Sequence, residues 1–142
     1  MPCPPLPGTR LLRSLLSSCL CLALCLSLVL SGCSSAGRLS GNYVDDTVQV
    51  AQSLLSTIAI PQDDPGHQAA ETEARALIND YIARYRPRND VNGLPSFTTM
   101  QTALNSLAGH YSAYANRPLP DALRTRLEKE LRKAENSANR GA

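Results

Sequence analysis

Apolar residues recur at helical spacing in four segments between residues 42 and 142, and polar or turn-forming residues separate these segments. In each segment the apolar positions step by three or four residues, which places them on one face of an α-helix. The four stripes are Val44, Val48, Ala51, Leu55 and Ile58; Ala70, Ala74, Leu77, Tyr81 and Tyr85; Phe97, Met100, Leu104, Leu107, Tyr111 and Tyr114; and Leu123, Leu127, Leu131, Ala134 and Ala138. The pattern predicts four amphipathic helices.

Residues that start or stop helices lie between the stripes. The expected N-caps are Asn42, Asp64 (with Pro65 at the first helical position) and Ser96, and the expected stops are Pro61 and Pro87. Each helix then spans roughly 17–22 residues, about 25–33 Å. Because the connections are short, successive helices should be antiparallel neighbours. The expected fold is all-α, a four-helix up-down-up-down bundle over residues 42–142.

The first 32 residues have a different pattern, which is typical of an export signal. Arg10 and Arg13 supply a positive charge, and residues 15–30 are sixteen uncharged, leucine-rich residues. This apolar stretch is shorter than the roughly 20 residues that a transmembrane helix needs, so a signal-peptide interpretation fits better.

The residues at the end of this segment, Leu30-Ser31-Gly32-Cys33, form a lipobox. The cysteine thiol must be accessible to a lipid transferase, and the peptidase needs small side chains beside the bond that it cuts. We therefore predict a cleaved lipoprotein signal peptide over residues 1–32 and a lipidated flexible tether over residues 33–41. Cys33 would carry a diacylglycerol and an N-acyl chain, and it would be the one cysteine of the mature chain. The alternatives are a soluble secreted protein with a coincidental cysteine and an uncleaved membrane helix.

Charge is balanced over the mature chain but divided along it. Residues 33–142 contain twelve Lys and Arg and twelve Asp and Glu, although the whole chain has a formal charge of +2. Residues 33–80 have a net charge of −5 and residues 81–142 a net charge of +5. Nucleic-acid binding is not expected, because it usually requires an overall basic surface. The division could orient a protein partner, or antiparallel helices could simply neutralise one another.

Few residues are candidates for chemistry. Asp63, Asp64 and His67 could be considered as metal ligands, but aspartates are expected at a helix start and His67 should be a surface position. His110 borders the third apolar stripe and is expected to be a boundary histidine with one hydrogen bond. Phosphate-binding loops, nucleophile elbows and zinc motifs are absent from the sequence. We expect neither an enzyme, nor a metal site, nor a bound cofactor other than the covalent lipid.

The polar face of the third predicted helix is unusual because it contains no charged residue. Thr98, Thr99, Gln101, Thr102 and Asn105 occupy positions where a solvated face would usually have Lys and Glu. Such a face can contact another protein without burying charge. The alternative is an ordinary polar surface.

Five segments carry a resemblance to a known family. They are residues 43–47 (YVDDT), 73–82 (EARALINDYI), 96–104 (SFTTMQTAL), 108–111 (AGHY) and 116–120 (NRPLP). Together they resemble the photosystem II assembly and repair lipoproteins of cyanobacteria, which are small four-helix lipoproteins of the thylakoid lumen. The resemblance extends over essentially all of residues 42–142.

The resemblance implies a non-enzymatic protein that is lipid-anchored at the thylakoid membrane on its lumenal side. It implies transient binding to incomplete photosystem II, chiefly to the lumenal loop of an inner-antenna chlorophyll-binding subunit. Release would come before the manganese cluster and the extrinsic subunits are installed, and the free protein should be a monomer. The alternatives are a stoichiometric extrinsic lumenal lipoprotein of the mature oxygen-evolving complex, and a metal carrier or enzyme.

Residues off the apolar stripes but inside or beside the resembling segments are the candidates for partner contact. They combine the polar positions of the second and third helices with nearby arginines. The seven candidates are Asp80, Arg84, Thr98, Thr99, Gln101, Asn105 and Arg117. Arg84 and Arg117 belong to the basic half of the chain, which could guide it toward an acidic loop.

Overall fold

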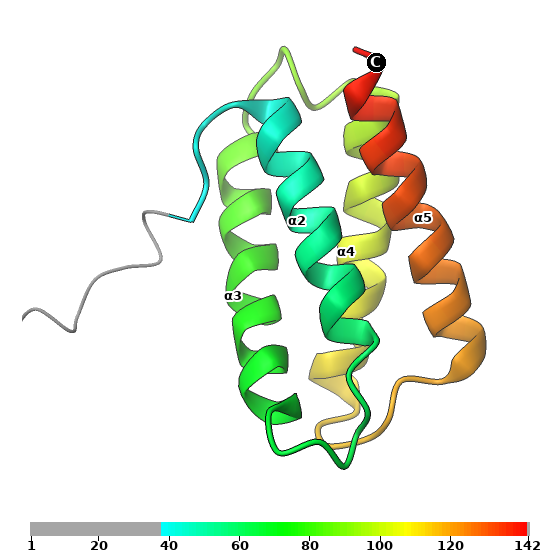
Figure 1. Cartoon of the computed structure of the whole chain (residues 1–142). Coiled ribbons are helices and arrows are strands. Elements are labelled where there is room, and N and C mark those ends of the chain that lie inside the picture. Colours follow the sequence, from blue (N-terminus) through cyan, green and yellow to red (C-terminus); the bar gives the residue numbers. More distant parts are fainter. Residues whose placement is uncertain (1–37, 142) are drawn as a thin grey trace, which may run out of the picture. The chain divides into compact units, whose positions relative to one another are not determined.

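Four helices pack as a bundle in the computed structural model, which describes residues 38–141. In chain order they are α2 (Tyr43–Ile58), α3 (His67–Tyr85), α4 (Pro95–Ala113) and α5 (Asp121–Asn139). Successive helices run in opposite directions, as Figure 1 shows. The predicted all-α four-helix bundle is confirmed.

The bundle has two ends, which are named here as they lie in Figure 1. The upper end contains the start of α2, the α3–α4 connection (residues 86–94) and the end of α5. The lower end contains the α2–α3 connection (residues 59–66) and the α4–α5 connection (residues 114–120).

The core is continuous along the bundle and contains most of the predicted apolar positions. Leu104, Leu107 and Leu127 are at most 1% exposed. At the upper end the core is aromatic: Tyr81 is tilted against Tyr85 at 4.9 Å between ring centroids and stacks with Phe97 at 6.2 Å. Offset aromatic pairs of this kind add packing energy beyond the area that they bury.

One of the three predicted N-caps is confirmed. The side chain of Asn42 accepts hydrogen bonds from the backbone N–H groups of Val44 (3.0 Å) and Asp45 (3.4 Å), as a cap at the start of α2 should.

The prediction that Asp64 caps the second helix is wrong, because α3 begins three residues later, at His67. The carboxylate of Asp64 instead accepts from the N–H of Gly66 at 2.7 Å. This local hydrogen bond stabilises a turn that competes with the helix.

The prediction of Ser96 as a cap is also wrong. Helix α4 starts one residue earlier, with Leu94 as N-cap and Pro95 at the first position. A proline is well suited to that position because its missing N–H has no helical partner there. The Ser96 side chain is buried and forms a 2.7 Å hydrogen bond with the hydroxyl of Tyr43 on α2.

The buried face of α2 is rotated from the predicted one. Val44, Val48 and Leu55 are only half-buried, whereas Asp46 and Thr47 are fully buried. The hydroxyl of Thr47 bonds to the Tyr43 carbonyl at 2.6 Å and to the Tyr81 hydroxyl at 2.7 Å. Polar side chains can occupy a core when every group has a partner, and apolar periodicity does not detect them.

The third apolar stripe is one residue too long. Tyr114 lies beyond the end of α4 and is 51% exposed. Its ring packs beside His110, with ring centroids 5.4 Å apart. The α4–α5 connection then turns at Asn116, which adopts a left-handed backbone conformation (φ 64°) that asparagine tolerates.

Candidate functional site

Residues 38–41, which were expected to belong to the flexible tether, are held on the bundle by α2 and α3. Leu39 is 8% exposed and joins the core. The buried carboxylate of Asp46 accepts from the N–H of Ser40 (2.7 Å), the hydroxyl of Ser40 (2.7 Å) and the N–H of Gly41 (3.0 Å), and also from the hydroxyl of Tyr85. We call this group, Leu39, Ser40, Gly41, Asp46 and Tyr85, the clasp.

The electrostatics of the clasp are those of a satisfied buried carboxylate. Burial raises the pKa of Asp46, but the hydrogen bonds from Tyr85, Ser40 and Gly41 lower it further, so the net pKa lies below the ordinary value. Burial and the neighbouring Asp46 raise the pKa of Tyr85. Sequence reasoning read Asp46 only as a favourable charge at a helix start; the signal that could have revealed the clasp is the flexible Ser40-Gly41 pair just before it.

Gly41 is required in the clasp by its backbone. Its φ of 91° belongs to the left-handed region, which side chains other than glycine rarely adopt. The Nη1 atom of Arg84 lies 3.2 Å from the position that a Cβ would take on Gly41. Arg84 is therefore next to the clasp, on the side of α3 that faces α2.

Asp80 lies one helical turn before Arg84 and shares that side of α3. It is half-buried, and its Oδ2 atom is buried with no hydrogen-bond partner among residues 38–141. Glu73 continues the same side two turns earlier and pairs with Arg38 at 3.2 Å. Asp80 and Arg84 thus belong to the region around the N-terminal segment.

The four candidate residues on α4 lie in the upper half of that helix. Thr98 and Asn105 are two turns apart and both are exposed, whereas Thr99 and Gln101 are half-buried on either side of them. The hydroxyl of Thr98 donates to the carbonyl of Leu94 at 3.3 Å, so it is partly satisfied within its own helix. The 19 residues of α4 contain no Asp, Glu, Lys or Arg.

Arg117 lies at the other end of the bundle, in the α4–α5 connection. Its guanidinium is exposed and lies 5.8 Å from the ring centroid of Tyr114. Its carbonyl accepts a 3.4 Å hydrogen bond from Nε2 of His110. The structure therefore divides the seven candidates into three places: Asp80 and Arg84 beside the clasp, four residues on α4, and Arg117 at the lower end.

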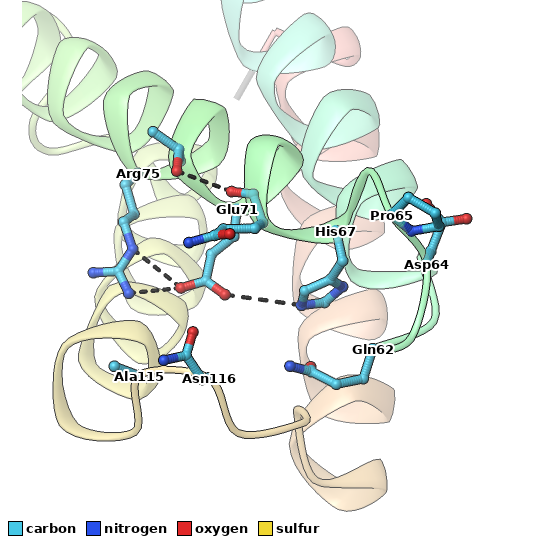
Figure 2. Close-up of a pocket in the computed structure, with 10 residues that line it drawn as sticks. Gln62, Asp64, Pro65, His67, Glu71, Arg75, Ala115 and Asn116 are labelled. Carbon is cyan, nitrogen blue, oxygen red and sulfur yellow. Dashed lines mark hydrogen bonds and ion pairs between the residues drawn. The ribbon is translucent and has the colours of Figure 1, made fainter.

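A cleft of about 430 Å³ opens at the lower end, between the start of α3 and residues 115–116 (Figure 2). Glu71 projects into it and accepts from Arg75 at 2.6 Å and 3.2 Å. Arg75 also donates to the carbonyl of Tyr111 and lies 5.1 Å from the centroid of the Tyr111 ring. Burial and the charge of Glu71 raise the pKa of Tyr111 to about 12.

His67 also lines the lower-end cleft, so the expectation that it is a surface position is wrong. Its side chain is only 19% exposed, and its Nε2 lies 3.8 Å from Glu71. Asp64 borders the same cleft, but Asp63 is not among its lining residues. Among residues 38–141, His, Cys, Asp and Glu side chains form no group of three that could hold a metal ion. His110 is 8% exposed and has the single hydrogen bond already described.

The predicted lipidation site, Cys33, lies outside the described residues, as do the signal peptide and residues 34–37 of the tether. None of the helices between residues 38 and 141 combines the length and the apolarity needed to cross a membrane.

Comparisons with known proteins give a consistent match. The family model described as photosystem II Pbs27 matches residues 9–137. The chain is 51% identical over 111 residues to photosystem II lipoprotein Psb27 of Synechocystis sp., covering 78% of this chain and 83% of that protein. It is 51% identical over 104 residues to photosystem II assembly factor lipoprotein Psb27 of Thermosynechococcus vestitus, covering 73% and 78%.

A plant protein and a solved structure extend the match. Photosystem II repair protein PSB27-H1 of Arabidopsis thaliana is 32% identical over 100 residues, covering 70% of this chain and 58% of that protein. The solution structure of Psb27 from cyanobacterial photosystem II superposes with a TM-score of 0.72 at 51% identity, covering 78% of this chain and 97% of that one.

Proposed function

We propose, because the chain belongs to the photosystem II Pbs27 family, that it is a photosystem II assembly and repair factor. In this proposal it binds transiently to the lumenal side of incomplete photosystem II, on the lumenal loop of an inner-antenna subunit. It leaves before the manganese cluster and the extrinsic subunits are installed. The names of the relatives, which include an assembly factor and a repair protein, support the general role.

The observation that supports a binding role most directly is the charge-free surface of α4. Thr98 and Asn105 face outward on a helix without any Asp, Glu, Lys or Arg, while α5 on the neighbouring side has nine such residues. An interface that buries few charges avoids their desolvation penalty. We propose that Thr98, Thr99, Gln101 and Asn105 contact the partner.

The transient role is tested by purifying photosystem II through a tagged core subunit and separating inactive assembly complexes from oxygen-evolving ones. The protein should be present in the inactive complexes and strongly depleted from the active ones. If it is instead present in oxygen-evolving complexes in a one-to-one ratio with the core, the alternative of a stoichiometric extrinsic subunit is correct.

We also propose that Cys33 is lipidated and that the protein is anchored at the thylakoid membrane on the lumenal side. The lipobox and the lipoprotein names of two relatives support this. Intact-mass analysis of the mature protein should give a chain that starts at Cys33 with a mass increment of lipid size. Two or more acyl chains give stable anchoring where one is marginal.

The matching control is Cys33→Ala, which should remove the lipid increment. Because Cys33 precedes the described bundle, the variant should keep the helical circular-dichroism spectrum of the wild type. An unmodified Cys33, or a mature chain that begins elsewhere, would refute the lipid anchor.

A further inference from the structure

The clasp leaves only a short free segment between the proposed lipid and the bundle. Three hydrogen bonds from Ser40 and Gly41 to Asp46 fix these residues at the first turn of α2, and Leu39 is buried beside them. Cys33 lies five residues before Arg38, a span of at most about 18 Å. Arg38 is itself paired with Glu73 at 3.2 Å. A lipid on Cys33 would therefore keep the clasp close to the bilayer surface.

The upper end of the bundle, which carries the clasp, is basic. Arg84, Arg86 and Arg140 are exposed there, and within residues 38–141 no salt bridge forms at any of the three. Arg88 is at the same end but pairs with Asp90 at 2.5 Å. Arg84 is next to the clasp, as its 3.2 Å approach to the Cβ position of Gly41 indicates.

The lower end has the opposite character. Asp63, Asp64 and Asp121 are exposed there, and Arg117 is the exposed base among them. The charges of Glu71 and Arg75 are paired with each other at 2.6 Å. The bundle is therefore polarised along its axis, with the basic end at the point where the chain leads to Cys33.

We infer that the upper end rests on an anionic lipid surface, with Arg84 and Arg86 against the headgroup phosphates, so that the clasp orients the bundle as well as tethering it. This inference rests on the proposed lipid at Cys33. An acyl anchor combined with a nearby basic patch is a recurrent arrangement for stable attachment to anionic membranes. The clasp is essential because a free nine-residue tether would let the bundle rotate.

The orientation has a consequence for partner binding. Helix α4 begins at the upper end and ends at the lower end (Figure 1), so it stands across the membrane surface when the upper end faces the lipid. Its charge-free face is then presented sideways, toward lumenal loops of neighbouring membrane proteins. Arg84 contacts lipid in this arrangement and not the partner.

The test uses the mature lipidated protein bound to vesicles of phosphatidylcholine alone or mixed with phosphatidylglycerol. A fluorophore is attached through Asn92→Cys at the upper end or Ala115→Cys at the lower end, both exposed positions. Headgroup-labelled quencher lipid should quench the upper probe strongly and the lower probe weakly, and the difference should be larger on the anionic vesicles.

Arg84→Gln with Arg86→Gln should reduce quenching of the upper probe on anionic vesicles to its value on neutral ones. Each arginine near an anionic surface is worth about fivefold, so the oriented population should fall about 25-fold relative to other orientations. The matched control is Lys129→Gln with Arg132→Gln, which removes the same charge from exposed positions on α5. It should leave the quenching unchanged.

Equal quenching of the two probes, or no effect of lipid charge or of the Arg84 and Arg86 changes, would overturn the inference. It would also be overturned if that double variant kept its orientation but lost binding to photosystem II intermediates, because the arginines would then belong to the partner interface. Protein that fails to stay on any vesicle would refute the lipid anchor, and the inference with it. Failure of the photosystem II role would leave the vesicle result intact.

Discussion

Replacing Asp46 with alanine should lower the free energy of unfolding by about 2–4 kcal/mol, because the change removes the acceptor of four hydrogen bonds at once. The two backbone N–H groups can turn to water, since residues 40–41 are at the surface. The hydroxyl of Tyr85 cannot, because Tyr85 is fully buried. Urea-induced unfolding followed by circular dichroism measures the loss.

The neighbouring aspartate provides the control. Asp45 lies in the same first turn of α2 and has the same favourable position relative to the helix dipole, but it is exposed and takes no part in the clasp. Asp45→Ala should cost less than about 1 kcal/mol. Equal losses in the two variants would mean that the charge at the helix start matters and the clasp does not.

The acid dependence of stability should change as well. The folded-state pKa of Asp46 is depressed, so its contribution to stability is present above the pKa of the unfolded chain and disappears as the pH falls through the folded value. That window lies below about pH 4. The difference in stability between wild type and Asp46→Ala should therefore shrink in this range, while the difference for Asp45→Ala should stay small throughout.

Sequence periodicity was sufficient for the fold but not for the exact faces. The steps in the third and fourth stripes place Leu104, Leu107 and Leu127 in the core, where the structure has them. The same reasoning failed on α2, because Asp46 and Thr47 are polar and their burial depends on partners from residues 40–41 and α3. Those partners are distant in sequence or lie in a segment that looked like a linker.

The candidate contact residues failed to cluster for a related reason. Position off the apolar stripe shows that a residue is not in the core, but it does not show which neighbouring helix it faces. Arg84 and Arg117 are both basic and both near resembling segments, yet they lie at opposite ends of the bundle. Only the packing of α3 beside α2 reveals that Arg84 is adjacent to the clasp.

Adding negative charge to α4 should weaken binding to photosystem II assembly intermediates at least tenfold, about 1.4 kcal/mol. The variant is Thr98→Glu with Asn105→Glu, at two exposed positions on the outward side of that helix. If this surface is covered by the partner, each new carboxylate must lose its water without a prepared cation, which is costly. The affinity of the purified variant for isolated intermediates is measured directly, and its circular-dichroism melting curve should match that of the wild type.

The control variant makes the same chemical changes on α5. Thr125→Glu with Asn136→Glu alters two exposed positions there, where charged residues already dominate the surface. Because both doubles change the net charge equally, a general repulsion from an acidic partner would weaken the two alike, whereas contact through α4 would weaken only the first. Wild-type affinity in the α4 variant would exclude this face as the interface. The lower-end surface around Arg117 would then be the next to alter, since it lies away from the membrane-facing end proposed for the clasp.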